Sequence, residues 1–105
     1  MIYVLKLENN KWYVGKTRSL KRRLKQHFSG RGAKWTQLHN PVECVETSFN
    51  IDEKTMTLNY MEKYGWENVR GYCWSARNLK KNPLIINYII TIVIHILIKR
   101  LLILY

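Results

Sequence analysis

The chain has 105 residues, which is the size of a single domain with one modest core, so a multi-domain machine is excluded. Its 18 Lys and Arg residues against 7 Asp and Glu give a formal net charge of +11, which predicts nucleic acid as the polyanionic partner, with an anionic membrane surface as the alternative. The excess lies in residues 1–35, where ten cations stand against one acid; residues 36–83 hold six of each, and residues 84–105 hold two cations and no acid.

Two short apolar runs open the chain and predict a β-hairpin. IYVLKL at 2–7 and WYVG at 12–15 are rich in aromatic and β-branched residues, and they flank the turn-prone residues 8–11. Because side chains alternate along a strand, Tyr3 and Tyr13 share a sheet face only if the connecting loop has an odd number of residues or a bulge. A two-residue turn at Asn9-Asn10 would place them on opposite faces.

A basic segment follows and predicts a helix that runs to Phe28. Thr17 or Ser19 can cap its start, and Gly30 can end it. Its apolar stripe is expected to consist of Leu20, Leu24 and Phe28.

Arg23 and His27 lie on that helix, four residues apart. Residues at this spacing share a helix face, and here that face adjoins the apolar stripe. We therefore expect both side chains at the edge of the core rather than in open solvent.

The middle of the chain predicts a third strand. RGAKWTQLHNP at 31–41 is typical of a loop or a short helix, and PVECVETSF at 41–49 alternates as a strand does.

A second long helix is expected over residues 51–65. Asn50 or Asp52 can cap its start, and Gly65 can end it. Residues 66–83 mix aromatic and turn residues with only a weak pattern, so no regular element is expected there.

The composition changes abruptly after residues 80–83 (KKNP), which divides the chain into a domain at 1–83 and an Ile- and Leu-rich tail at 84–105. The uninterrupted apolar part, 84–98, is shorter than the roughly 20 residues that a spanning helix needs, although the whole tail nearly reaches that length. In a helix, one narrow polar stripe would contain Asn87, Thr91, His95 and Lys99. Four interpretations stay open: a helix that packs on the domain, one that lies on a membrane, one that spans it as a tail anchor, or an extension of the reading frame under little selection.

Cys44 and Cys73 are far apart and lack the spacing of zinc ligands, so neither a zinc site nor a disulfide framework is predicted. We expect two buried thiols in a reducing compartment. The N-terminus turns polar after seven residues and has no secretory signal, so the expected location is intracellular, in the cytoplasm, nucleus or nucleoid, with membrane association through the tail as a further possibility.

The spacing of several motifs resembles that of the GIY-YIG nuclease family over about residues 1–75. IYV at 2–4 and YVG at 13–15 resemble the paired family motifs, and GRGAKWTQLHNP at 30–41 resembles the segment that leads to the third strand. The resemblance implies a small α/β (α+β) domain with a three-stranded antiparallel sheet flanked by helices. Its catalytic positions correspond here to Tyr3, Tyr13, Lys16, Arg23, His27 and Glu62.

Two positions depart from the family pattern. Met1 stands before Ile2 in place of a leading Gly, which leaves the reactive Tyr intact. Asn78 is a candidate for the orienting Asn that follows the second helix in many members, but Trp74 or Ser75 falls where that Asn is expected.

The resemblance implies a divalent-metal-dependent DNA endonuclease. We expect one Mg²⁺ (or Mn²⁺) held by Glu62 and substrate oxygens. Tyr3 or Tyr13 is the candidate base, because cations at Lys16 and Arg23 favour the phenolate of a group whose unperturbed pKa is about 10. His27 is the alternative base or relay, and the forked guanidinium of Arg23 would stabilise the transition state.

Six further cations are expected to hold the DNA backbone without reading its sequence. They are Arg18, Lys21, Arg22, Lys25, Arg31 and Lys34. The enzyme would then be selective for DNA structure, only weakly specific, or dependent on a partner protein for its specificity. Two other functions stay open: a nucleic-acid-binding module without turnover on the same scaffold, and a membrane-anchored basic protein.

Overall fold

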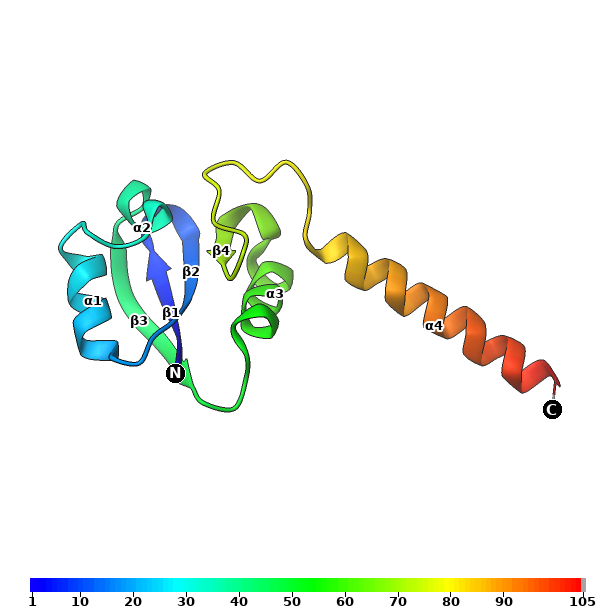
Figure 1. The fold of residues 1–105 in the computed structure, drawn as a ribbon. Coiled ribbons are helices and arrows are strands. Elements are labelled where there is room, and N and C mark those ends of the chain that lie inside the picture. The colour runs from blue at the N-terminus through cyan, green and yellow to red at the C-terminus, as the bar shows by residue number, and fades with distance from the viewer. Residues whose placement is uncertain (105) are drawn as a thin grey trace.

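A four-stranded sheet in the order β3-β1-β2-β4 forms the centre of the domain (Figure 1). The computed structural model describes residues 1–104, so Tyr105, the last residue of the expected tail, lies outside the described residues. The strands are β1 (Ile2–Leu7), β2 (Lys11–Lys16), β3 (Pro41–Ser48) and β4 (Val69–Gly71). β1 pairs antiparallel with both β2 and β3, as expected.

β4 corrects the prediction of a purely antiparallel three-stranded sheet. It pairs with β2 in the parallel direction, through Trp12↔Val69 to Val14↔Gly71. Three residues are too few to display the alternation that identifies a strand in a sequence, so β4 could not be found before the fold was known.

Helices cover both faces of the sheet (Figure 1). The chain forms α1 (Leu20–Phe28), α2 (Lys34–Leu38), α3 (Glu53–Tyr64) and α4 (Leu84–Leu104), with short 3-10 turns at Glu8–Asn10 and Trp66–Asn68. Asp52 caps α3, since its carboxylate accepts the Thr55 N–H at 2.7 Å. Gly65, with φ of 91°, ends α3 in a backbone region that side chains disfavour.

The hairpin loop has the odd number of residues that places Tyr3 and Tyr13 on the same face of the sheet. Leu7 pairs with Lys11, so three residues, Glu8–Asn10, connect the strands. Asn9 and Asn10 take φ values of 63° and 56°, which Asn tolerates better than most residues. Both tyrosines therefore lie on the same face of the sheet.

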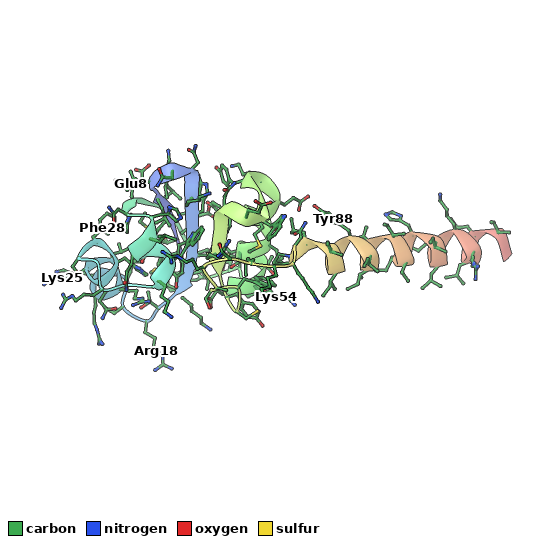
Figure 2. All side chains as sticks on the ribbon, turned by 90° about the horizontal axis from the view of Figure 1, so that it is seen from above. Glu8, Arg18, Lys25, Phe28, Lys54 and Tyr88 are labelled. Atoms are coloured by element: carbon green, nitrogen blue, oxygen red, sulfur yellow. The ribbon has the colours of Figure 1, made fainter. Side chains whose placement is uncertain are left out.

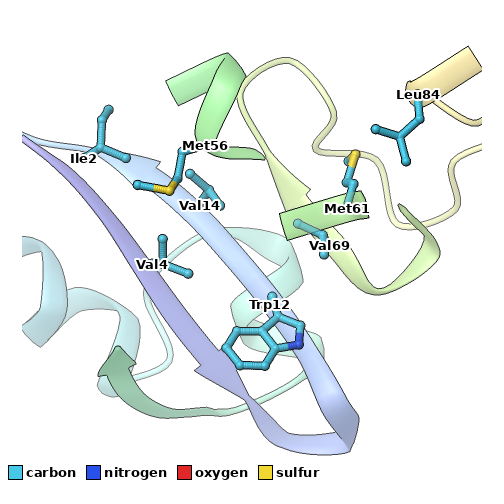
Figure 3. Packing of buried hydrophobic residues seen from close by; sticks show 8 residues of the cluster. All are labelled: Ile2, Val4, Trp12, Val14, Met56, Met61, Val69 and Leu84. Atoms are coloured by element: carbon cyan, nitrogen blue, oxygen red, sulfur yellow. The ribbon is translucent and has the colours of Figure 1, made fainter. Parts of the chain in front are cut away.

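Each face of the sheet has its own apolar cluster. One face, called here the even-numbered face because the even-numbered residues of β1 and β2 point to it, packs against α3; the opposite face is called the odd-numbered face. The cluster of the even-numbered face contains Ile2, Val4, Trp12, Val14, Met56, Met61, Val69 and Leu84 (Figure 3). The odd-numbered face packs against α1 and α2. Its buried residues are Tyr3, Leu5, Leu7 and Trp35, with Leu20 and Leu24 of α1 partly buried beside them.

The buried stripe of α1 differs from the expected one at its last position. Phe28 is 50% exposed, whereas His27 is fully buried. At about 100° per residue, the position seven after Leu20 returns to within about 20° of it, whereas the eighth lies about 80° away. His27, expected at the edge of the core, is thus inside it.

The cysteines also differ from expectation. Cys44 is partly buried on the edge strand β3, and Cys73 is exposed in the loop after β4. They are free thiols, but neither is a fully buried one.

α4 extends away from the sheet, and the described chain measures 60 × 29 × 18 Å (Figures 1 and 2). Its first residue, Leu84, is buried in the cluster of the even-numbered face. The described apolar side chains beyond it are exposed.

Arg70 of β4 stabilises the loop that follows β4 by hydrogen bonds to backbone carbonyls. Its buried guanidinium lies 4.1 Å from the centroid of the Trp35 ring in α2, and Nε donates to the Ala76 carbonyl at 2.7 Å. Its other nitrogens donate to the carbonyls of Val69, Glu67, Arg77 and, at 3.4 Å, Trp66. Sequence reasoning attached no role to this residue, which looks like any other cation in the chain.

Replacing Arg70 should destabilise the domain. In Arg70→Met the carbonyls that Arg70 holds would lose their partner, and we expect the free energy of unfolding to fall by about 3 kcal/mol, as for a broken buried charge network. Urea unfolding followed by circular dichroism measures this. Arg77→Met removes an exposed cation from the same loop and should change stability by less than about 0.5 kcal/mol. Equal stability of the two variants would contradict the role of Arg70.

Candidate active site

A chain of three buried polar side chains lies on the odd-numbered face. The Tyr3 hydroxyl is 2.6 Å from His27 Nε2, and His27 Nδ1 is 3.0 Å from Thr36 Oγ1. The Thr36 hydroxyl donates its only proton to the Ala33 carbonyl at 2.8 Å, so its oxygen must accept from His27. The proton of the neutral imidazole is therefore on Nδ1, and Nε2 accepts a hydrogen bond from Tyr3.

Two glycines make room for this chain. A Cβ at Gly15, on β2, would overlap the Tyr3 ring, which lies directly over it. A Cβ at Gly32 would overlap Nδ1 of His27. Gly15 of YVG and Gly32 of GRGAK are thus required because aromatic rings approach the backbone closely at both positions.

Tyr13 lies beside this chain and is partly exposed. Its ring centroid is 6.2 Å from that of Tyr3 and 5.1 Å from that of His27. The Arg23 guanidinium interacts with both tyrosine hydroxyls and also donates to Gln26 Oε1 at 2.8 Å. Four of the expected site residues, Tyr3, Tyr13, Arg23 and His27, are therefore brought together.

Burial decides the protonation of this cluster. It raises the pKa of both Tyr3 and Tyr13, and the nearby Arg23 opposes that rise without cancelling it. The expected effect of Arg23 on the phenolate is present but smaller than desolvation. Burial, and then the charge of Arg23, lower the pKa of His27 to about 4, so the imidazole is neutral at pH 7.

Glu53 is a carboxylate whose charge acts on this cluster, and no sequence argument singled it out. Its charge contributes to the raised pKa of both tyrosines, and its Oε1 accepts the backbone N–H of Tyr72 at 3.1 Å. Glu62 is exposed nine residues later in α3. At 3.6 residues per turn it points to the opposite side of the helix from Glu53, about 13 Å further along it.

Lys16 and Asn78, the two remaining candidates, lie apart from the tyrosines. Lys16 is exposed at the end of β2 and shares a depression of about 410 Å³ with Glu53. Asn78 lines a different depression, of about 630 Å³, together with Lys11 and His39. The structure therefore places Lys16 with Glu53 in one depression and Asn78 in another, and none of Tyr3, Tyr13, Arg23 and His27 lines either of them.

The six cations expected to hold DNA are all exposed. Four of them, Arg18, Lys21, Arg22 and Lys25, lie on or just before α1, and Figure 2 shows Arg18 and Lys25 directed away from the domain. Arg31 follows α1 and donates to Ser29 Oγ at 3.2 Å. Lys34 begins α2 and lines the cleft beside Tyr13.

The donor set fits only one kind of metal site. Within residues 1–104, no group of three or more His, Cys, Asp or Glu side chains could hold an ion, which argues against a zinc-type site. A single carboxylate such as Glu53 suits Mg²⁺, which keeps several waters and takes substrate phosphate oxygens as further ligands.

Sequence reasoning missed Thr36, Glu53 and the two glycines as parts of the site. Thr36 and Gly32 stand inside GRGAKWTQLHNP, and their roles need the fold to become visible. Glu53 follows the cap residue Asp52, a position where acids commonly serve only the helix dipole. No signal in the sequence identifies it, because only the fold brings it into one depression with Lys16.

Comparison with known proteins identifies the family of the chain. Residues 1–70 match the family model of the GIY-YIG catalytic domain. UPF0213 protein YazA of Bacillus subtilis is 40% identical over 62 residues, which span 58% of this chain and 63% of that protein. UPF0213 protein CPE1444 of Clostridium perfringens is 40% identical over 81 residues, or 76% of this chain and 87% of that protein. UPF0213 protein BH0048 of Halalkalibacterium halodurans is 38% identical over 64 residues, or 60% and 68% of the two chains. No solved structure matches the chain.

The buried neutral His27 predicts a specific pH dependence of stability. Its pKa is about 4 in the folded protein and about 6.5 when unfolded, so below pH 6.5 the unfolded chain binds more protons. This contribution to stability is complete above pH 6.5 and is lost as the pH falls to 4. The free energy of unfolding, measured in urea across that range, should fall more steeply for the wild type than for His27→Gln. Parallel curves would contradict the assignment.

Proposed function

Since the chain belongs to the GIY-YIG family, we propose that it is a divalent-metal-dependent endonuclease that hydrolyses phosphodiester bonds in DNA. The main support is the single cluster in which Tyr3 hydrogen-bonds His27, the Tyr13 ring lies beside both, and the charge of Arg23 acts on both tyrosines. Such a cluster offers proton transfer and phosphate binding within one small region, which is what hydrolysis of a phosphodiester needs.

Tyr13 is the proposed group that receives a proton from the attacking water, because it is partly exposed whereas Tyr3 is buried. A neutral Tyr13 must release its own proton as it does so. Tyr3 stands next to it and donates to the unprotonated Nε2 of His27 at 2.6 Å. The proton of Tyr13 can thus pass to Tyr3 while the proton of Tyr3 passes to His27, and Thr36 keeps the imidazole oriented.

Charge on the phosphoryl oxygens would be stabilised by Arg23, whose fork matches phosphate geometry. We propose Glu53, rather than Glu62, as the carboxylate that would hold a Mg²⁺ or Mn²⁺ ion, with Lys16 in the same depression. A bound ion would supply Lewis-acid stabilisation of the phosphoryl and leaving oxygens.

DNA is the proposed partner because the exposed cations cluster on one side of the active site. Arg18, Lys21, Arg22 and Lys25 surround α1, the helix that carries Arg23 and His27. Backbone contacts of this kind position the substrate without specifying sequence. A partner protein is one proposed source of sequence specificity.

One observation favours the alternative of a nucleic-acid-binding module without turnover. Asn78, the candidate orienting residue, lines a depression other than the one that contains Glu53. Binding of DNA that is unaffected by metal and leaves no product would identify this second function.

Two acids in α3 give a matched test of the endonuclease. Glu53→Gln should lower the rate of supercoiled plasmid nicking by at least about 100-fold, because it removes the proposed metal ligand. Glu62→Gln makes the same chemical change on the far side of α3 and should leave the rate within about twofold. EDTA should abolish nicking by the wild type. Loss of nicking in Glu62→Gln, with normal nicking in Glu53→Gln, would contradict Glu53 as the metal ligand and identify Glu62 instead.

A further inference from the structure

A cleft of about 810 Å³ opens beside Tyr13, between α2 and the loop that follows β4. Lys34 and Gln37 line it from α2, and Tyr72 and Arg77 line it from the loop. No carboxylate is among its described lining residues. Arg70 also contributes to the wall, but backbone carbonyls occupy its donors, so it shapes the cleft while Lys34 and Arg77 supply accessible charge.

Tyr72 is presented rigidly at this cleft. It is 49% exposed and takes a φ of 55°, which is uncommon for an aromatic residue. A tight turn holds it, because Gly71 and Trp74 exchange backbone hydrogen bonds of 3.0 and 2.9 Å. Glu53 fixes its N–H, and the Trp74 ring lies 5.5 Å away.

An exposed aromatic ring above a basic cleft is the combination that binds unpaired bases. Bases stack on aromatic side chains with little regard for sequence, while cations follow the phosphates. The volume is within the range of sites that enclose small molecules the size of a nucleotide. Bases inside a duplex are already stacked on each other, so Tyr72 can only receive one that has left the helix.

We propose that this cleft binds one unpaired nucleotide next to the phosphate that is cleaved, with its base on Tyr72 and its phosphates at Lys34 and Arg77. The substrate class is then DNA with an unpaired strand, such as a flap or branch, rather than continuous duplex. This proposal rests on the proposed function, because it places the nucleotide beside Tyr13.

The test uses the full chain in EDTA, so that no strand is cut, and a flapped DNA that carries 2-aminopurine in the unpaired strand. Wild type should quench the fluorescence of this base by stacking. Tyr72→Ala should remove the quenching and weaken flap binding about tenfold, which corresponds to the loss of one base–aromatic stack, while Tyr72→Phe retains both. Phe28→Ala is the matched control, because Phe28 is 50% exposed on α1, away from the cleft.

Unchanged flap binding by Tyr72→Ala, or an equal loss of duplex binding, would overturn the site. The proposed function fails separately: quenching in EDTA together with no nicking in Mg²⁺ would reject the endonuclease and keep the nucleotide site. Nicking in Mg²⁺ without quenching in EDTA would reject the nucleotide site and keep the endonuclease.

A second inference concerns α4, which is independent of the active site. From Ile85 to Ile103, the large apolar side chains that the structure describes are each between 47% and 83% exposed. They lie on every side of the helix, so no single apolar face is left for the domain to cover. A helix that is apolar over most of its circumference, here with one narrow polar stripe at 87, 91, 95 and 99, is typical of a membrane span.

The dimensions and charges of α4 fit a bilayer. Its 21 residues extend about 31 Å at 1.5 Å per residue, close to the hydrocarbon thickness of about 30 Å. The mean hydropathy over Leu84–Ile103 is 1.9. Lys80 and Lys81 precede it on the side of the basic domain, and Lys99 and Arg100 lie near enough to the far end for their long side chains to reach the opposite headgroups.

We infer that α4 spans a bilayer with anionic headgroups and holds the domain on its cytoplasmic side, where basic flanking residues are retained. The full chain should float with vesicles of phosphatidylcholine and phosphatidylglycerol and stay bound in high salt and in carbonate. Ile92→Asp, near the bilayer centre, should abolish flotation. Ile103→Asp, near the helix end, should retain it, because the penalty for a charge falls toward the interface.

Three outcomes would overturn the spanning helix. Flotation of Ile92→Asp equal to that of the wild type would remove the helix as the cause. Release of the wild type by high salt would show a peripheral electrostatic contact. A stable dimer or higher oligomer that does not float would show that a second copy of the chain covers α4.

Discussion

The hydrogen bond between the Tyr3 hydroxyl and His27 Nε2, 2.6 Å long and closed off from solvent, is the constraint around which this domain is arranged. It joins the inner strand β1 to α1 inside an apolar cluster, where an unpaired hydroxyl or imidazole would destabilise the fold. Three neighbouring residues support that pairing. Gly15 and Gly32 leave space for the rings, and Thr36 satisfies the second nitrogen of the imidazole.

The same burial keeps the cluster uncharged at rest. Tyr3 and Tyr13 have raised pKa values, and His27 has a lowered one. Of the groups that meet there, Arg23 alone carries a charge at neutral pH, and it lies at the margin of the cluster. Arg70 is a second cation near the cluster, paired in register with Tyr13, but it is buried and backbone carbonyls occupy its donors. Arg23 can therefore still bind an anion, whereas the hydrogen-bond donors of Arg70 are used to stabilise the fold.

Much of this arrangement could be predicted from the sequence, and the failures have physical causes. The hairpin and α1 follow from their apolar patterns, although Ser19 at the start of α1 makes no capping hydrogen bond, and α3 follows from its cap residue Asp52 and from Gly65. The grouping of Tyr3, Tyr13, Arg23 and His27 follows from motif spacing. β4 was missed because three residues carry no period. Phe28 was placed inside because a four-residue repeat drifts around a helix of 3.6 residues per turn. Glu53 was overlooked because a first-turn acid looks like a helix-dipole partner, and only the packing of α3 shows which acid faces the site.

The three-residue loop Glu8–Asn10 has a consequence for how this hairpin can change in length. Inserting or deleting one residue there would invert the facing of every later side chain in β2, exchanging Tyr13 with the core residues Trp12 and Val14. Paired insertions preserve the facing, as does a single insertion absorbed by a bulge. Loss of one residue here, with no bulge to absorb it, would therefore disturb both faces of the sheet at once, whereas most substitutions in either strand affect one side chain.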